Sequence, residues 1–432
     1  MTNTIIKPLC DVTQYGAKGD GVTKDTVAIQ NAINQCPLNG IVLFPKGKVF
    51  LSGTIYLKSH MTLRIEPGSI LRGSRDDSDY PDLVPHITNT QLSNCKKALI
   101  YSENVQDVTI EGFTENLPET SKKPFHEFGL IDGNGSFHDH WQGHESTRPM
   151  ILFLTTSSQV TVRNIQLINS GMWTLVQFEN DHVLIDHVKI DSTWWPNRDG
   201  IDIVDCHDVV IQNVEVNSQD DSICLKSGSQ KGVKNLIVRN SVIKNSIVAN
   251  AIKLGTASVG FFENLLFENI NIEATRQAAM AVESVDGAHL KNIQFQNITF
   301  ANVGSVFFVL LGERIGSPGI GSIEDLRFNN IKGSTNRNWG SVISGTKINN
   351  NTYSITNLVM SNIDITNTTL DNLKQIPNAP LEYDGQYPDP RMWETMPAYG
   401  IFLRHVINLK VSTTKFHSVQ GDPRQEFIKV EN

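Results

Sequence analysis

The sequence predicts an all-β protein folded as a right-handed parallel β-helix, with a short helix that caps its N-terminal end. Three observations lead to this prediction: an eight-fold internal repeat, an alternation of apolar and polar residues inside each repeat, and one early segment of helical periodicity. A chain of 432 residues is long for one ordinary domain, but some all-β folds reach this length. We therefore expect a single β-helix domain over residues 1–432.

The N-terminal cap region is expected over about residues 1–40. The segment DTVAIQNAINQC, residues 25–36, has apolar residues at helical spacing and begins with an Asp that can cap a helix. The end of a solenoid would otherwise leave its apolar interior open to water, so terminal repeats need such a cap.

The repeat itself runs from residue 160 to residue 365 at intervals of 23 to 33 residues, within the range of solenoid repeats. One coil cannot bury its apolar face alone, whereas stacked coils form a continuous interior, and aligned Asn side chains can form hydrogen bonds from coil to coil. A propeller would also repeat, but it requires four strands in each blade of roughly 40 residues. The repeats are 160–167, 183–190, 209–216, 236–243, 265–272, 293–300, 326–333 and 358–365, with Asn164, His187, Asn213, Asn240, Asn269, Asn297, Asn330 and Asn362 at their fifth positions.

A long loop without the repeat is expected over about residues 372–400, flanking the expected groove. It is rich in proline, and the repeat resumes after it at IFLRHVINLKV. Its aromatic residues could form an ordered wall of a sugar site, or the loop could be a packed cover over the end of the helix. The aromatic residues are Tyr383, Tyr387, Trp393 and Tyr399.

Composition excludes several classes of protein. A net charge of −8 argues against a nucleic-acid partner, and no apolar run approaches the roughly 18 residues that span a bilayer. The five cysteines are too scattered for a metal site, and we interpret them mostly as small buried residues. A Cys206–Cys224 disulfide is the less favoured interpretation. We expect a monomer.

The first residues, MTNTIIKPLCDVTQYGAKGDG, contain no long apolar signal core. We therefore expect a cytoplasmic protein if the chain is complete, and a secreted or periplasmic one if a signal was removed.

Two acidic clusters follow equivalent strands. Asp199 follows the repeat 183–190, and Asp220 and Asp221 follow the repeat 209–216, so all three should lie on one flank of successive coils. Neighbouring parallel strands lie about 4.8 Å apart, so the three carboxylates could converge on one exposed face. Like charges so close resist joint ionisation, which would give one proton donor beside ionised neighbours, as glycosidic bond hydrolysis requires. Asp residues also populate turns, but QDDS interrupts a strong strand pattern here. Asp202 and Asp205 are interpreted as turn or strand-edge residues.

The next two coils offer polar side chains for a sugar. Asn250 and Lys253, in VANAIKLGTAS, could contact a sugar hydroxyl or carboxylate, although Lys253 could equally be a solvated surface residue. Arg276, in ATRQAAMAVES, carries a fork of donors that suits a carboxylate. Asn197, the first residue of NRDG, completes the predicted substrate-binding set.

These motifs resemble those of the pectin-degrading glycoside hydrolases of family 28, the polygalacturonase family. YGAKGDGVTKDTVAIQNAI is similar to the opening of that β-helix superfamily, and SGMWTLVQF, NRDGIDI and QDDSICLKS resemble the central motifs, written N-T-D-G and G-D-D. PDPRMWETMPAYGIFLRHV is similar to the tail of a bacterial branch. The resemblance extends over nearly the whole chain.

The resemblance implies an inverting hydrolase of bonds to galacturonic acid in pectin-type oligosaccharides. It implies that Asp220 is the general acid and that Asp199 and Asp221 activate the water, and it implies no metal and no organic cofactor. The sequence departs from the family twice: ANA replaces G-H-G, which puts Asn250 where the histidine would be, and R-I-K has no clear match near 276–284. These departures concern the substrate rather than the acid and base.

Two other functions are compatible with the sequence. A β-helix polysaccharide lyase or epimerase would need a base such as Lys253 beside the uronate. A carbohydrate-binding β-helix without catalysis is the third possibility, against which the three Asp positions speak.

Overall fold

The computed structural model describes residues 7–88, 96–113, 125–135, 147–194, 196–371, 373, 375, 376, 380–393 and 395–430. The fold is a right-handed parallel β-helix, as the sequence predicts. The chain divides into two compact units. One comprises Met1–Ile87, Ser93–Asp202 and Cys206–Glu215, and the other comprises Thr88–Leu92, Ile203–Asp205 and Val216–Asn432. The single domain over 1–432 stays a prediction.

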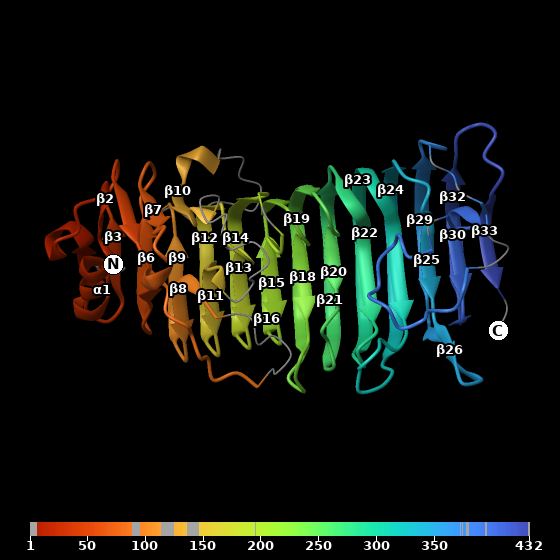
Figure 1. Cartoon of the computed structure of the whole chain (residues 1–432), viewed down its shortest axis with the longest axis horizontal. Coiled ribbons are helices and arrows are strands. Elements are labelled where there is room, and N and C mark those ends of the chain that lie inside the picture. The colour runs from red at the N-terminus through yellow and green to blue at the C-terminus, as the bar shows by residue number, and fades with distance from the viewer. Residues whose placement is uncertain are drawn as a thin grey trace, which may run out of the picture. The chain divides into compact units, whose positions relative to one another are not determined.

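The capping helix α1 spans Thr26–Gln35 in the first unit and lies beside β1, at the N-terminal end of the chain (Figure 1). It buries Ile29, Ala32 and Ile33, in agreement with the helical spacing of the sequence. The predicted side-chain cap is wrong, because Asp25 occupies the N-cap position without a capping hydrogen bond. Its carboxylate instead accepts hydrogen bonds from the backbone N–H groups of Lys18 and Gly19, at 2.7 and 3.0 Å.

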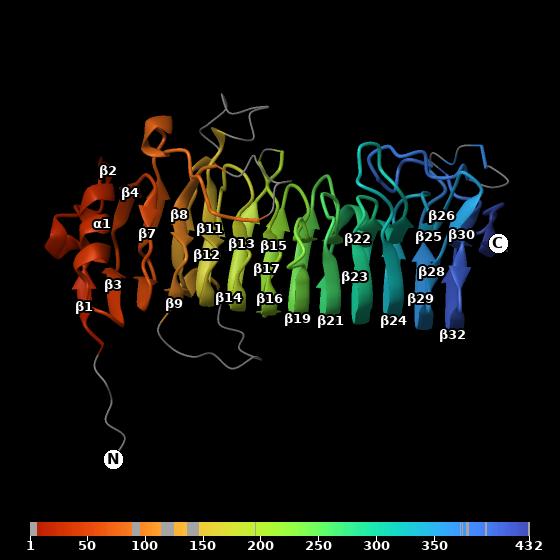
Figure 2. The same cartoon turned by 90° about the horizontal axis from the view of Figure 1, so that it is seen from below.

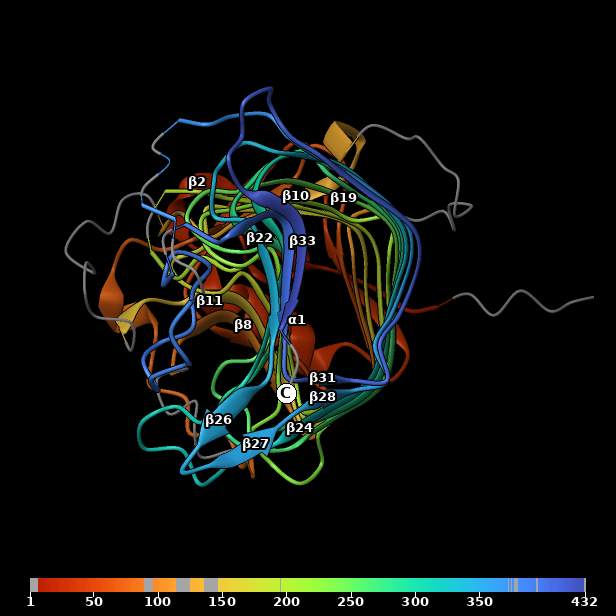
Figure 3. The ribbon, with the colours of Figure 1, turned by 90° about the vertical axis from the view of Figure 1, so that its right-hand side faces the viewer.

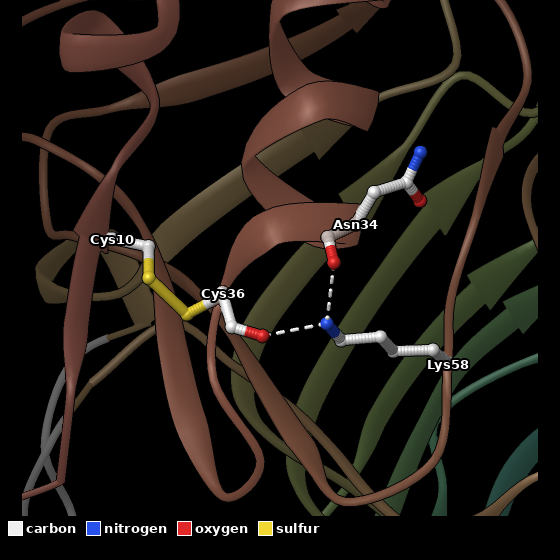
Figure 4. The surroundings of a disulfide bond; sticks show 4 residues. All are labelled: Cys10, Asn34, Cys36 and Lys58. Carbon is white, nitrogen blue, oxygen red and sulfur yellow. Dashed lines mark hydrogen bonds between the residues drawn. A yellow bond between two sulfur atoms is a disulfide. The ribbon is translucent and has the colours of Figure 1, made fainter.

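A disulfide joins the cap to the first strand. Cys10 and Cys36 are bonded, with a Cα–Cα distance of 5.7 Å, so these two cysteines are not merely small buried residues (Figure 4). Beside it, Nζ of Lys58 donates to the carbonyl oxygens of Asn34 and Cys36, at 3.0 and 2.6 Å. A cation at this position satisfies carbonyl groups that the end of the helix leaves unpaired.

The strands of the first unit pair in parallel and in the register that the repeat predicts. Val160 pairs with Val183, which pairs with Val209, so equivalent apolar side chains stack in the interior. The strands of this unit are β1 (Leu9–Asp11), β2 (Asp20–Lys24), β3 (Gly40–Phe44), β4 (Val49–Ser52), β5 (Ile55–Tyr56), β6 (Met61–Ile65), β7 (Ile70–Gly73), β8 (Ala98–Glu103), β9 (Gln106–Glu111), β10 (Gly129–Asp132), β11 (Met150–Thr155), β12 (Ser158–Ile168), β13 (Leu175–Phe178), β14 (Asp181–Ser192) and β16 (His207–Gln212), with short 3-10 turns η1 (Val12–Tyr15), η2 (Asp77–Asp79) and η3 (Phe125–Glu127).

The second unit continues the same register through strands that lie side by side in Figure 2. Phe267, Phe295 and Phe328 stack inside it, with successive ring centroids 4.7 and 5.3 Å apart. The strands are β18 (Ile223–Lys226), β19 (Val233–Ser246), β20 (Ile252–Leu254), β21 (Phe261–Ile272), β22 (Thr275–Ser284), β23 (His289–Leu311), β24 (Ser322–Thr335), β25 (Ser341–Ser344), β26 (Thr346–Ile348), β27 (Asn351–Tyr353), β28 (Ile355–Thr356), β29 (Val359–Asn367), β30 (Ala398–Arg404), β31 (Val406–Ile407), β32 (Lys410–His417) and β33 (Gln425–Val430); β15 (Ile201–Val204) and β17 (Glu215–Ser218) contain the unit boundaries.

The fifth position of every repeat is a left-handed corner. All eight residues there have φ between 51° and 55°, a region that Asn tolerates better than most side chains. In the second unit the predicted coil-to-coil hydrogen bonds are present: Asn269 donates to Asn240 at 3.2 Å, Asn297 to Asn269 at 3.0 Å and Asn330 to Asn297 at 2.8 Å. Asn therefore recurs at this position for two reasons: it tolerates the left-handed backbone conformation, and its side chain forms hydrogen bonds between coils.

The described part of the 372–400 loop covers an apolar face of the second unit. Tyr383 and Met396 are buried against Ala281 and Phe308, and the ring of Trp393 lies 6.3 Å from that of Phe308. This part of the loop is a packed cover, but it lies on a face of the strands β22 and β23 and not over the end of the helix, as one of the two expectations had it. Figure 3 also shows the β26–β27 hairpin projecting from the stacked strands. Among the described residues, no helix is long and apolar enough to cross a membrane.

Candidate active site

Asp220 and Asp221 lie in the turn between β17 and β18. The hydroxyl groups of Ser218 and Ser246 both donate to the carbonyl oxygen of Asp220, at 2.8 and 2.6 Å, and the N–H of Asp221 donates to Oδ1 of Asp220 at 2.9 Å. The turn is therefore held from its own coil and from the next. It presents two carboxyl groups with oxygen atoms within 4.8 Å of each other.

Asn250 orients the carboxylate of Asp221. Its backbone N–H and its Nδ2 both donate to Oδ1 of Asp221, each at 2.9 Å. Its own Oδ1 accepts from the N–H of Ala278 at 3.0 Å, and the residue is 2% exposed. Asn250, which was predicted to bind substrate, thus uses both ends of its amide to fix Asp221 between neighbouring coils.

Lys253 is buried beside the same carboxylate. Its Nζ lies 3.2 Å from Oδ2 of Asp221 and donates to the hydroxyl of Tyr387 at 2.9 Å. The residue is 4% exposed, so it is not the solvated surface lysine that was one interpretation of the sequence. Tyr387 comes from the long loop, which therefore reaches the predicted site as well as covering the strands.

The environments of the two aspartates drive their pKa values apart. Burial and the negative charge of Asp221 raise the pKa of Asp220. Burial alone would raise that of Asp221 too, but Lys253, Lys226 and the hydrogen bonds from Asn250 lower its pKa below the usual value. A protonated carboxyl group beside an ionised one is the arrangement that separates an acid from a base.

Glu283 is a further buried carboxyl group, which was not among the predicted site residues. It lies on β22, it is 1% exposed, and its Oε2 has no hydrogen-bond partner among the described residues. Burial and the negative charge of Asp221 together raise its pKa to about 8, although Lys253 opposes the shift. The signal for it in the sequence was an acidic residue inside the apolar strand AAMAVES.

The first unit holds the other predicted residues. Asn197 accepts a hydrogen bond from Nη2 of Arg148 at 2.9 Å, in a corner with φ of 59°. Asp199 is buried, and the N–H of Thr174 donates to its carbonyl oxygen at 3.0 Å. Asp202 is fully buried within the strand β15, with a carboxylate oxygen within 4.8 Å of one of Asp199, so of its two interpretations, turn or strand edge, the turn does not apply. Asp205 belongs to the second unit and directly follows the last residue of β15, with φ of 50°.

Arg276 is the remaining predicted site residue. It is exposed at the start of β22, and within the described ranges it makes no hydrogen bond or ion pair. Arg314, a cation near the ring of Tyr387, is paired with a carboxylate, because its Nε lies 2.7 Å from Oδ1 of Asp286.

Two family descriptions match parts of this chain. The family described as "Glycosyl hydrolases family 28" matches residues 125–384, and that described as "Rhamnogalacturonase A/epimerase, pectate lyase-like" matches residues 9–68. The exo-poly-alpha-D-galacturonosidase of Dickeya chrysanthemi is 37% identical over 134 residues, which are 31% of this chain and 21% of that protein. A probable polygalacturonase of Vitis vinifera is 28% identical over 232 residues, 50% of this chain and 44% of the relative.

Among solved structures, the family 28 exopolygalacturonase of Yersinia enterocolitica has a TM-score of 0.68 at 17% identity, over 99% of this chain and 78% of that one. This likeness concerns the fold. The chain spans less than half the length of the two curated relatives it matches. Since the family match extends over more than half of the residues, the chain belongs to family 28 of the glycosyl hydrolases.

Proposed function

We propose that this protein is an inverting glycoside hydrolase of pectin-type glycans that contain galacturonic acid. Asp220 is the general acid, and Asp199 and Asp221 activate the water. The observation that carries the proposal is the opposite shift of two neighbouring carboxyl groups, raised at Asp220 and lowered at Asp221. The two relatives described above, an exo-poly-alpha-D-galacturonosidase and a probable polygalacturonase, support the substrate class.

The position of Asp199 in the chain supports its share in the reaction. The N–H of Asp205 donates to the carbonyl oxygen of Lys226 at 3.1 Å, as between neighbouring parallel strands. Asp199 precedes Asp205 by six residues, and Asp221 precedes Lys226 by five. Asp199 and Asp221 thus precede a pair of hydrogen-bonded residues by nearly the same number of residues. We therefore expect them on the same flank of neighbouring coils.

The chemistry follows from the protonation states. Asp220 donates its proton to the glycosidic oxygen as the bond to the anomeric carbon breaks. A water molecule forms a new bond to that carbon and loses one proton. Asp221 and Asp199 share the role of the base that accepts this proton. The side chains of Asn250 and Lys253 keep Asp221 ionised in this step, because both interact with the carboxylate. The reaction needs no other reactant.

An Asp220→Asn variant tests the general acid. We expect a loss of about 10³-fold in kcat for release of reducing ends from galacturonic-acid-containing oligosaccharides, with an unchanged melting temperature. The matched control is Asp364→Asn, because Asp364 lies on β29 of the second unit with a side chain that is 54% exposed. Full activity of Asp220→Asn would contradict the proposal.

The stereochemistry needs its own measurement. The oxygen atoms of Asp220 and Asp221 lie within 4.8 Å, closer than the roughly 6.5–9.5 Å usual between the carboxyl groups of inverting enzymes. Inversion is proposed from the resemblance to the family, and NMR of the first product anomer checks it. Retention of configuration would replace the water in this scheme by a carboxylate nucleophile.

Analysis of the reaction products also distinguishes hydrolysis from the other reaction classes. A lyase would release an unsaturated product that absorbs in the ultraviolet, and a binding protein would bind oligosaccharides without cleaving them. Lys253 is a poor base for a lyase, because the carboxylate of Asp221, 3.2 Å from its Nζ, stabilises the charged form and raises the pKa of Lys253 well above the ordinary value in spite of burial.

We also propose that the protein folds in an oxidising compartment, periplasmic or extracellular. The Cys10–Cys36 disulfide supports this location over the cytoplasm. Mass spectrometry of unreduced peptides from the native host would find the two cysteines linked. Finding both alkylated instead would favour the cytoplasm. A monomer remains the expected state, to be measured by light scattering.

A further inference from the structure

Lys253 and Tyr387 meet next to Asp221, and the charge of Lys253 acts on a third residue, the buried Glu283. Lys253 lies on β20, Glu283 on β22 and Tyr387 on the long loop, 134 residues after Lys253. We call these three residues the Tyr387 subsite. Its register is fixed by the strands, since Cys224 of β18 pairs with Lys253, which pairs with Ala281, two residues before Glu283.

The cations in and beside this subsite already form ion pairs with carboxylates of the chain. Lys253 lies 3.2 Å from Asp221, and Arg314, whose guanidinium lies 5.8 Å from the Tyr387 ring, is paired with Asp286 at 2.7 Å. Lys226 acts on Asp221 as well, because it lowers the pKa of that carboxylate. A uronate bound here would have to compete with Asp221 for Lys253.

Glu283 adds a second obstacle to a uronate and an advantage for a hydroxyl. Its carboxyl group is buried with an unpaired Oε2, and burial raises its pKa to about 8, so it is protonated at neutral pH. A buried polar atom without a partner is costly unless a ligand or water satisfies it. A protonated carboxyl group can both donate to and accept from a sugar hydroxyl.

Tyr387 supplies the apolar part of the subsite. It is 56% exposed although its hydroxyl is held by Lys253, and its ring lies 5.3 Å from Nζ of Lys253. A fixed and partly open aromatic ring suits the C–H face of a pyranose, as in other sites that combine aromatic walls with a few polar groups.

We propose that the Tyr387 subsite binds a neutral sugar unit of the glycan, through hydroxyl contacts to Glu283 and stacking on Tyr387, and disfavours a uronic acid. This rests on the proposed function, and it refines the substrate to a glycan in which neutral sugars accompany galacturonic acid. It also gives a physical meaning to the missing R-I-K motif, since β22 carries a carboxyl group where a uronate would need a cation.

The test compares matched oligosaccharides. Galacturonic acid oligomers are prepared alongside counterparts in which single rings at defined positions carry a hydroxymethyl group in place of the carboxylate. Binding is measured by calorimetry to the Asp220→Asn variant, and cleavage is measured with the wild type. For one ring position, we expect the neutral ring to be bound at least tenfold more tightly than the uronate. Equal affinity at every position, or tighter binding of the uronate throughout, would overturn the inference.

Two further variants assign the effect to the subsite. Tyr387→Ala should weaken binding of the preferred oligosaccharide about tenfold, whereas Tyr387→Phe should stay within about threefold. Glu283→Lys, with its fold checked by melting temperature, should reduce the preference for the neutral ring. Unchanged affinity and preference in Tyr387→Ala would also overturn the inference. Absence of cleavage with the binding preference intact would contradict the proposed hydrolysis and not the subsite.

Discussion

At the scale of single residues, the site depends on how Asp221 is kept ionised while its neighbour Asp220 keeps a proton. Burial would favour the neutral form of both, so the difference comes from Lys253, Lys226 and the two hydrogen bonds of Asn250. Removing one of these supports should change the pH range of activity and leave the fold intact.

The wild type should have a bell-shaped dependence of kcat/KM on pH. In the proposed mechanism Asp221 acts as the ionised group and Asp220 as the protonated one, so we expect activity to be lost as pH falls through the lowered pKa of Asp221 and as pH rises through the raised pKa of Asp220. Asn250→Ala removes a donor to Asp221, so the acidic limb should move to higher pH and kcat at the optimum should fall about tenfold.

A matched control for Asn250→Ala is Asn271→Ala, which removes an exposed Asn of β21 that accepts one hydrogen bond from Thr299. Its pH profile should coincide with that of the wild type. An acidic limb that stays in place in Asn250→Ala would contradict the role given to this amide.

At the scale of elements, each coil turns at its fifth position with φ near 54°, and Asn serves both the corner and the ladder. Asn269 lies in the middle of the ladder, with hydrogen bonds to Asn240 and Asn297. Asn269→Ala should lose about 2–3 kcal/mol, because it removes two hydrogen bonds and forces Ala into the left-handed region.

Asn269→Gly separates the two causes. Glycine adopts the corner freely, so this variant should lose only about 1 kcal/mol and melt at a higher temperature than Asn269→Ala. Equal melting temperatures for the two variants would show that the backbone conformation contributes nothing.

The cap is a second element with its own prediction. The Cys10–Cys36 disulfide closes a loop of 26 residues around α1, so the double variant Cys10→Ser/Cys36→Ser should lose about 3 kcal/mol. Hydrogen exchange should increase over residues 9–44 and remain unchanged in the second unit. Wild type treated with a reducing agent should behave like the variant, and a reduced cap with unaltered exchange would contradict this account.

At the scale of the whole molecule, periodic features were predictable from the sequence and contacts between distant segments were not. The repeated Asn gave the register of β19, β21 and β23, because one spacing recurs with one physical cause. The Cys10–Cys36 pair and the Lys253–Tyr387 contact join segments whose approach depends on how a cap or a loop folds back. No local pattern encodes such an approach.

The net charge of −8 leads to a prediction for the entire protein and its substrate. A galacturonate-rich polymer is a polyanion, so long-range repulsion should slow its association at low ionic strength, where the screening length is about 30 Å at 0.01 M. Raising the salt to 0.15 M shortens this length to about 8 Å, and kcat/KM for the polymer should rise about two- to threefold. The shortest oligosaccharide that is cleaved serves as the control, because its few charges should make kcat/KM nearly independent of salt. A fall in kcat/KM for the polymer would instead mean that a local basic groove outweighs the overall charge.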